Sequence, residues 1–233
     1  MNQGYPRLLG DIGGTNARWA WQASAGAELQ DVSVQPCEDS ASIQESAANY
    51  LLAHGHANPR WAGVGIATVI TGDDVRLTNS SWRFSIAAFK QTMGLERCLV
   101  VNDFTALAMS LPALKSTDLQ ALGGGVAVAG ATIGLLGPGT GLGVSGLVPD
   151  ASGRYSALAG EGGHVTLSAN DDVESNLLAL LRKQFDHVSA ERVLSGSGLV
   201  NIYKAVCAMQ GCAARDLEPA DVTDAAVAGT DAQ

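Results

Sequence analysis

A glycine turn between two apolar segments, near the start of the chain, constrains the fold most. Residues 8–21 read LLGDIGGTNARWAW, an apolar run, the pair Gly13-Gly14, and then an alternation of apolar and polar residues. This order predicts a strand, a tight turn and a second strand, because glycine enters such turns without the steric cost of a Cβ atom. The turn would present backbone N–H groups and the Thr15 hydroxyl, which suit phosphate oxygens. An ordinary β-hairpin is the plainer alternative.

Asp11 ends the first of these strands, beside the predicted phosphate site. A carboxylate there repels a phosphate unless a cation lies between them, so we expect Mg²⁺, held directly or through water. The segment lacks the pattern G-x-x-x-x-G-K-[ST], which excludes the usual class of P-loop nucleotide-binding proteins.

Composition limits the size of the domains and the classes of molecule that this protein can bind. The chain has 233 residues, 46% of them hydrophobic, which allows one large or two smaller domains with apolar cores. Its net charge is -9 and its 14 lysines and arginines are scattered, so we expect no nucleic-acid partner. We see no apolar run of membrane-spanning length and no signal peptide, and therefore expect a cytoplasmic protein without a membrane partner. The four cysteines fit no metal-binding spacing and are predicted to be free thiols.

Predicted strands and helices alternate in the first half of the chain, as they do in α/β proteins. After the hairpin, the expected strands are 29–34, 61–70 and 98–102, and the expected helices are 42–55, 85–94 and 104–111. Ser42, in a capping box, and Ser85 are the expected caps of the first two helices. The last of these strands ends at the polar pair Asn102-Asp103, and Pro112 ends the helix that follows. We therefore predict an α/β domain over residues 1–112 and a second domain over 113–233.

The opening pattern returns in the second domain. Residues 131–136 and 142–148 are predicted strands, and the Gly-Pro-Gly-Thr-Gly turn between them spans 137–141. A second phosphate-binding turn is therefore expected. The spacing G-x-G-x-x-G also occurs from Gly141 onward, but a dinucleotide-binding fingerprint must open a helix, and this one continues as a strand.

Polar residues in two further loops are candidate ligands. Glu161 and His164 lie among glycines in the loop LAGEGGH, and two such groups in a glycine-rich loop favour a site over ordinary loop polarity. Glu191 lies in a turn or short helix, where a glutamate in the first turn is favoured for structural reasons as well. The remaining expected helices run from a cap at Asp171 to about 185, from a cap at Ser197 to 210, and from 219 to 228.

Six segments carry a resemblance to a known family: GDIGGTNAR, TNSSWRFS, VNDFTA, GPGTGLGV, AGEGGHV and SAERVLSGSGLVNIY. With these segments the chain resembles the proteobacterial-type glucokinases of the hexokinase–actin–Hsp70 superfold, over about residues 1–225. The resemblance implies an actin-like (ribonuclease H-like) α/β fold of duplicated βββαβα domains with a cleft between them. It also implies ATP-dependent phosphorylation of glucose at O6, the entry of glucose into glycolysis.

The resemblance assigns roles at the matching positions of the sugar site. Asp103 would be the general base for the glucose 6-hydroxyl, and Asn102 a sugar ligand beside it. Glu161, His164 and Glu191 would bind further hydroxyl groups. Asp103 could instead only cap the helix that starts after it, or it could do both.

The resemblance also assigns the groups that would bind ATP and Mg²⁺. Asp11 would be the carboxylate associated with the ion, through water. The first phosphate turn would consist of Gly13, Gly14, Thr15 and Asn16, and the second of Gly139, Thr140 and Gly141. Members of the family are often dimers, so a homodimer is a further expectation.

Two other interpretations stay open. One is a hexose kinase of the ROK group, although such kinases usually carry a cysteine-rich zinc motif and residues 165–190 contain no cysteine. The other is a sugar-binding module without catalytic activity. Members of the family continue beyond the position of residue 233 with an adenosine-binding loop and further helices. We therefore also expect a C-terminally truncated chain, a fragment of a glucokinase, and leave open whether this fragment turns over substrate.

Overall fold

The fold is that of a computed structural model, which describes residues 4–77 and 80–229. The segment TNSSWRFS begins with Thr78 and Asn79, which lie outside the described residues.

Two compact units make up the chain, and they are interleaved in sequence. The first consists of Met1–Gly130 and Pro149–Ala159, and the second of Ala131–Val148 and Gly160–Gln233. The boundary expected at residue 112 stays a prediction.

A mixed five-stranded sheet forms the centre of the first unit, in the order β3-β2-β1-β4-β7. β1 pairs antiparallel with β2 and parallel with β4, and β4 pairs parallel with β7. The strands are β1 (Arg7–Ile12), β2 (Asn16–Gln22), β3 (Gln30–Pro36), β4 (Trp61–Ile66) and β7 (Arg97–Asn102). The predicted hairpin and the α/β architecture are confirmed. β4 is shorter than expected, because both of its partners end in register with Ile66.

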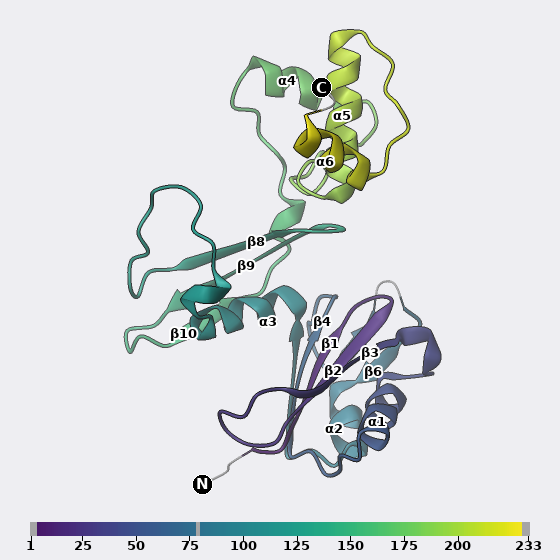
Figure 1. Ribbon diagram of the computed structural model, residues 1–233, viewed down its shortest axis with the longest axis vertical. Helices are drawn as coiled ribbons and strands as arrows, with labels where there is room; N and C mark the ends of the chain where they lie inside the picture. Colours follow the sequence, from purple (N-terminus) through teal and green to yellow (C-terminus); the bar gives the residue numbers. More distant parts are fainter. Residues whose placement is uncertain (1–3, 78–79, 230–233) are drawn as a thin grey trace. The chain divides into compact units, whose positions relative to one another are not determined.

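Helices cover both faces of this sheet (Figure 1): α1 (Ile43–Ala53) and α2 (Ile86–Thr92) lie on one face and α3 (Asp103–Ser110) on the other. The predicted caps of α1 and α2 are confirmed, since Ser42 accepts the Glu45 N–H and Ser85 accepts the Ala88 N–H. These bonds satisfy N–H groups that the first helical turn leaves unpaired.

The main apolar core lies between the sheet and the helices α1 and α2. Trp19 and Tyr50 are fully buried there, and the Trp19 indole N–H donates to the Ser46 hydroxyl at 2.9 Å. Trp82 and Phe84 belong to the same core.

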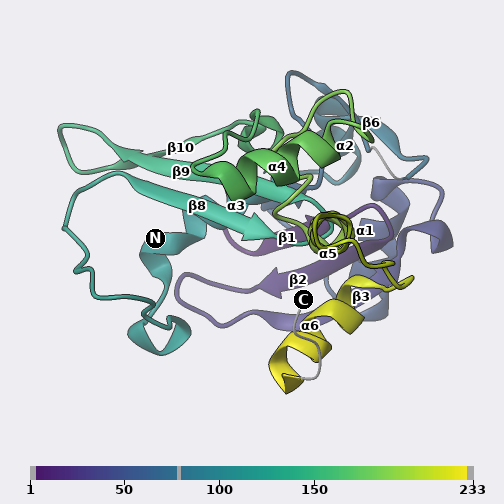
Figure 2. The same cartoon turned by 90° about the horizontal axis from the view of Figure 1, so that it is seen from above.

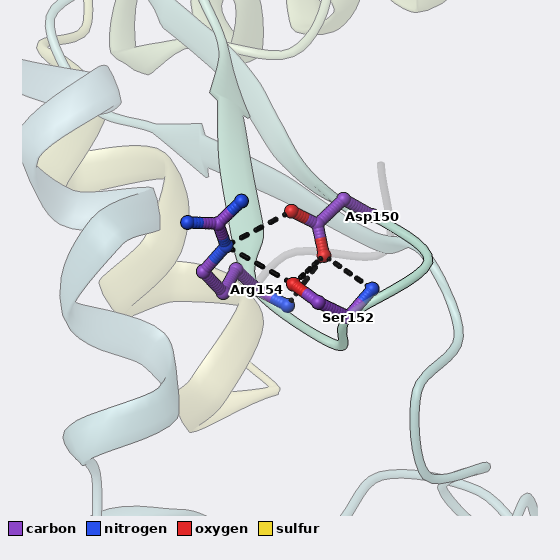
Figure 3. Close-up of polar contacts among 3 residues, drawn as sticks. All are labelled: Asp150, Ser152 and Arg154. Atoms are coloured by element: carbon purple, nitrogen blue, oxygen red, sulfur yellow. Dashed lines mark hydrogen bonds and ion pairs between the residues drawn. The ribbon is translucent and has the colours of Figure 1, made fainter.

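Two antiparallel strands that the sequence analysis did not foresee, β5 (Asp74–Arg76) and β6 (Arg83–Ser85), precede α2. The first unit also contains β10 (Tyr155–Leu158), which contacts α3. The turn before β10 is held by Asp150, whose carboxylate accepts hydrogen bonds from the backbone N–H groups of Ser152 and Arg154 at 2.8 and 2.9 Å (Figure 3).

The second unit begins with the antiparallel strands β8 (Ile133–Pro138) and β9 (Leu142–Pro149), which lie side by side in Figures 1 and 2. The predicted second strand–turn–strand is thus confirmed. Three helices follow, α4 (Asp172–Leu181), α5 (Gly196–Gln210) and α6 (Pro219–Ala228), and α5 contacts both of the others. A small core joins Leu178 and Leu181 of α4 to residues of α5 and of the loop between them.

Two helix ends of the second unit differ from expectation. The cap of α5 is Ser195 and not Ser197, because the Ser195 hydroxyl accepts the Gly198 N–H at 3.0 Å. α4 begins after the expected cap Asp171 but ends at Leu181, where the hydrogen bonds change to a three-residue spacing that tightens the chain into a turn.

Short 3-10 helices complete the described secondary structure: η1 (Cys37–Asp39), η2 (Leu111–Ala113), η3 (Ser116–Asp118) and η4 (Gly162–His164). Within residues 4–77 and 80–229, no helix combines the length and the apolar character needed to cross a membrane.

Candidate active site

The carboxyl ends of three parallel strands meet at one edge of the first unit's sheet. Ile12 of β1 lies opposite Ile66 of β4, which in turn lies opposite Asn102 of β7. This register places the predicted residues Asp11, Asn102 and Asp103 at the same edge, because parallel strands end on the same side.

Asn102 caps α3 and at the same time braces Asp103. Its side-chain oxygen accepts the N–H groups of Phe104 and Thr105 at 3.0 and 3.2 Å, and its amide nitrogen donates to Asp103 Oδ1 at 2.9 Å. The cap is therefore Asn102, where Asp103 was considered for that role, and Asp103 is the first helical residue. Asp103 Oδ1 also accepts the Phe104 N–H at 2.8 Å, so the carboxylate is held in one orientation.

The pKa of Asp103 is raised, and partial burial is the largest cause. The Phe104 N–H opposes this effect by stabilising the ionised carboxylate, while the nearby negative charge of Asp11 adds to it. A carboxylate with a raised pKa accepts a proton more readily, which is what a general base requires.

A hollow of about 350 Å³ opens beside the two carboxylates, lined by Gly10, Asp11, Gly65, Asp103 and Leu107 among others. The glycine at position 65 lets α3 pack closely against β4, since a Cβ atom on it would lie 3.2 Å from the Ala106 Cβ, a tight contact. The volume falls within the range of small-molecule sites.

The first glycine turn joins β1 to β2 next to this hollow. Its Gly13 N–H donates to Asn16 O at 2.9 Å, and the Asn16 amide donates to the Thr15 hydroxyl at 3.2 Å. Cys37 supports the turn from outside it: its N–H donates to Thr15 O at 2.8 Å and its thiol lies 3.6 Å from Gly13 O. A Cβ atom on Gly13 would meet only Asn16 O, at 3.5 Å, which is ordinary contact.

Asp11 and Arg18 form an ion pair of 2.9 Å across the hairpin. Both side chains are more than half exposed, so the pair is open to solvent and to ligands. Among the described residues, no three histidine, cysteine or acidic side chains cluster as metal ligands would. A single exposed carboxylate fits Mg²⁺, which usually keeps several waters and binds proteins through one or two carboxylates together with substrate phosphates.

The second glycine turn joins β8 to β9 in the second unit. The Gly139 N–H donates to Gly141 O at 2.8 Å, and the Gly196 N–H at the start of α5 donates to Gly139 O at 2.8 Å. Thr140, at the tip, is exposed. The backbone N–H of Leu142 donates to Glu191 Oε2 at 2.9 Å. Of the predicted residues in this unit, Glu191 therefore contacts the turn directly.

The loop that carries Glu161 and His164 lies close to the same turn. Its two polar side chains lie 3.9 Å apart and are both more than half exposed. Glu191 donates its backbone N–H to Gly163 O at 2.9 Å, which links the loop to the segment that supplies the carboxylate. A second hollow, of about 430 Å³, is lined by His164, Gln184, Asp186, His187, Glu191 and Arg192 among others.

The structure thus brings the predicted residues together within each unit. Asp11, the first turn, Asn102 and Asp103 gather in the first; the second turn, the loop and Glu191 gather in the second. The sequence analysis missed Arg18, which a count of register from the first turn would place opposite Asp11. It also missed the Leu142 N–H, whose partner is 49 residues away and leaves no local signal.

The chain is similar to known proteins over nearly its whole length. The family Glucokinase matches residues 8–233. A glucokinase of Paramagnetospirillum magneticum is 52% identical over 205 residues, which cover 88% of this chain and 64% of that protein. A glucokinase of Aromatoleum aromaticum is 48% identical over 227 residues, covering 97% and 68%. The chain thus spans about two thirds of the length of these relatives.

Solved structures agree with this similarity. The crystal structure of a glucokinase from an Antarctic psychrotroph matches with a TM-score of 0.88 at 37% identity, over 97% of this chain and 71% of that one. A ROK family protein from Streptococcus pneumoniae matches with a TM-score of 0.59 at 16% identity, over 96% and 68%, which is a likeness of fold alone.

Proposed function

We propose, from the premise that this chain belongs to the glucokinase family, that it phosphorylates glucose at O6 with ATP. The observation that carries the proposal is the edge of the first unit's sheet. There, the partly buried Asp103 carboxylate, whose pKa is raised, lines a hollow of small-molecule size together with Asp11. The first glycine turn begins two residues after Asp11.

Asp103 is proposed as the general base. It would accept the proton of the sugar 6-hydroxyl while the sugar oxygen bonds to the γ-phosphorus and the bond to the leaving ADP oxygen breaks. Phosphoryl transfer depends mainly on alignment and charge neutralisation, and a positioned base adds about 10²- to 10⁴-fold. Asn102 supports this role by fixing the orientation of the carboxylate with its 2.9 Å hydrogen bond.

Polar side chains from both units are proposed as ligands of the sugar hydroxyls. A neutral polyol has no charge to pair with, so a site that selects it uses hydrogen-bonding groups, and leaving such groups unpaired is how the site rejects an analogue. Asn102 and Asp103 fill this role in the first unit, and Glu161, His164 and Glu191 in the second.

The two glycine turns, Gly13 to Asn16 and Gly139 to Gly141, are proposed to bind the phosphates of ATP through backbone N–H groups. The donors would be N–H groups other than those of Gly13 and Gly139, which hold the turns themselves together. Asp11 would hold Mg²⁺ through water. When bound, the ion would neutralise phosphate charge beside that carboxylate.

A direct assay tests the proposal. Glucose 6-phosphate formation is measured with ATP and Mg²⁺ for the 233-residue chain and for Asp103→Asn, which keeps the shape of the side chain and removes the base. We expect turnover in the wild type and a loss of about 10²- to 10⁴-fold in the variant. Glu28→Gln, which removes an exposed carboxylate in the segment between β2 and β3, where β2 has run to the opposite end of β1 from Asp11, is the matched control and should retain full activity.

Calorimetry separates the alternatives. Glucose binding without turnover in either protein would favour the sugar-binding module, and turnover with another hexose but not with glucose would favour a kinase of different specificity, such as a ROK kinase. The cytoplasmic location and the homodimer remain parts of the proposal; light scattering of the purified chain tests the latter.

A further inference from the structure

Three segments of the second unit meet at Glu191. Its backbone N–H donates to Gly163 O in the candidate sugar loop, at 2.9 Å, and its carboxylate oxygen Oε2 accepts the Leu142 N–H at the end of the second glycine turn, also at 2.9 Å. One residue therefore connects the loop proposed for sugar to the turn proposed for phosphate. Both contacts are made between segments far apart in sequence.

The glycine at position 141 makes this contact possible. A Cβ atom there would lie 2.5 Å from Glu191 Oε2, which is closer than non-bonded atoms approach, and 3.3 Å from the carboxyl carbon, which is a tight contact. The carboxylate occupies the space that any other residue's side chain would need. The turn is thus shaped around Glu191, and not only around a ligand.

The loop and the turn are also packed directly together. A Cβ atom on Gly163 would collide with Leu142 O, a backbone atom that cannot rotate away, and one on Gly162 would collide with the Val144 side chain. The loop therefore cannot shift toward β9, and a change in the position of Glu191 is transmitted to Leu142 through the hydrogen bond that joins them.

The carboxylate can serve a ligand as well as the turn. An ionised carboxylate has about four acceptor positions, of which the Leu142 N–H uses one. The Glu191 side chain is partly exposed and lines the 430 Å³ hollow together with His164. A hydroxyl group entering from that hollow can donate to Glu191 while the contact with Leu142 persists.

We propose that Glu191 is a positioning residue that couples hexose binding to the order of the second glycine turn. A hexose hydroxyl that donates to the carboxylate fixes its rotamer, and the fixed carboxylate holds the Leu142 N–H, so that the turn is ordered before a phosphate reaches it. When the hexose orders the turn, the phosphate that binds next loses less conformational entropy and binds more tightly. By thermodynamic linkage the phosphate raises the affinity for hexose by the same factor. This inference rests on the proposed function, because it takes a hexose as the ligand of the hollow.

A double-mutant cycle tests the coupling. The dissociation constant of D-glucose is measured by calorimetry for the wild-type chain, Gly141→Ala, Glu191→Ala and the double variant. Gly141→Ala displaces the carboxylate from the turn, so we expect it to weaken glucose binding about tenfold, the equivalent of one lost hydrogen bond, although residue 141 is not a proposed sugar ligand. In the Glu191→Ala background the same change should alter binding by less than about twofold, because contacting residues are non-additive.

Gly134→Ala is the matched control, since it adds a methyl group to β8 of the same hairpin, where nothing lies within 4 Å. Its glucose dissociation constant should equal that of the wild type. Effects of Gly141→Ala and Glu191→Ala that simply multiply in the double variant would overturn the coupling.

Amide hydrogen exchange at Leu142 provides a readout that a merely structural contact would not move. Saturating glucose should slow this exchange about tenfold in the wild type and leave it unchanged in Glu191→Ala. Glu191→Gln should restore protection of the amide, because its side-chain oxygen can accept the Leu142 N–H, whereas the shorter Glu191→Asp should not.

Glucose that binds without slowing exchange at Leu142 would overturn the proposal. A chain that binds no glucose would refute the proposed substrate and the coupling with it. In that case the Leu142 amide could still be protected from exchange in the wild type and exchange freely in Glu191→Ala. This result would show that the hydrogen bond between Glu191 and Leu142 exists and that only the choice of glucose as ligand was wrong.

Discussion

The two glycine turns follow the same pattern of strand, turn and strand, but their glycines have different surroundings. At the first turn, a Cβ atom on Gly13 would lie 3.5 Å from Asn16 O, an ordinary contact. At the second, a Cβ atom on Gly141 would lie 2.5 Å from Glu191 Oε2. The contact between Glu191 and the second turn therefore depends on glycine at position 141, since a Cβ atom would displace the carboxylate, whereas the surroundings of Gly13 leave room.

The comparison extends to the acidic residue beside each turn. Asp11 is paired with Arg18 in an exposed ion pair, and Glu191 is bonded to a backbone N–H within the protein. A glycine in such a motif is thus not by itself evidence for a ligand. At Gly141 an internal contact accounts for the close approach, while the phosphate contact of Gly13 stays a prediction.

The largest effect is expected where packing is tightest, next to the second turn. Gly163→Ala directs a Cβ atom at the backbone carbonyl of Leu142, and overpacking of this kind costs about 1–3 kcal/mol of unfolding free energy. Gly160→Ala, in the same loop but with nothing within 4 Å, should change stability by less than about 0.5 kcal/mol. Denaturant unfolding measures both, and equal stability of the two variants would show that the second unit is not packed as described.

Gly13, in the first turn, has room for a methyl group, so its replacement should affect ATP binding and not stability. Gly13→Ala should leave unfolding free energy within about 0.5 kcal/mol of the wild type, because the added methyl group makes only ordinary contact. It should raise the KM for ATP about tenfold, because the added methyl group would hinder the approach of a phosphate to the turn at a cost similar to that of one hydrogen bond. A stability loss with unchanged KM would mean that packing, not a ligand, requires this glycine as well.

The ionised Asp103 carboxylate is expected to lower the stability of the first unit. Its pKa is raised, chiefly by burial, so the folded chain holds the proton more readily than the unfolded chain, and ionised Asp103 opposes folding above that pKa. Asp103→Asn should therefore melt at a higher temperature than the wild type at neutral pH, even though it loses turnover. The difference should shrink as the pH falls to about 4, near the ordinary aspartate pKa, where the wild-type group becomes protonated. A variant that melts lower at neutral pH would contradict this reasoning.

The smallest effect is expected for the exposed ion pair at the first turn. Arg18→Ala should cost at most about 1 kcal/mol, because solvent screens a pair in which both side chains are more than half exposed. Thermal melts in low and in about 1 M salt measure it, and the difference from the wild type should be nearly absent at high salt. A cost that salt does not reduce would assign Arg18 a packing role.

Local patterns in the sequence predicted much of the first unit. The hairpin, the caps at Ser42 and Ser85, and the polar pair that follows β7 were found because each depends on neighbours within a few residues. The cap of α5 was placed two residues late, since Ser195 and Ser197 are both serines near the start of the helix and only the structure shows that the Ser195 hydroxyl meets an N–H.

Long-range contacts could not be predicted in this way. Nothing near Glu191 in the sequence indicates the Leu142 N–H, because the contact depends on how β9 and the loop pack. The gathering of Asp11 with Asp103 follows from the parallel register of β1, β4 and β7, which the strands alone do not specify. The roles of these residues in binding and catalysis stay predictions.

The interleaved order of the two units has a consequence for how the chain is made. The first unit includes Pro149–Ala159, so a ribosome must deliver residue 159 before this unit can close, although most of it has emerged by residue 130. The strands β8 and β9 emerge in the interval. Translation adds about 5–20 residues per second, so the first unit waits about 1–6 seconds for its last segment, with the edge beside α3 still incomplete.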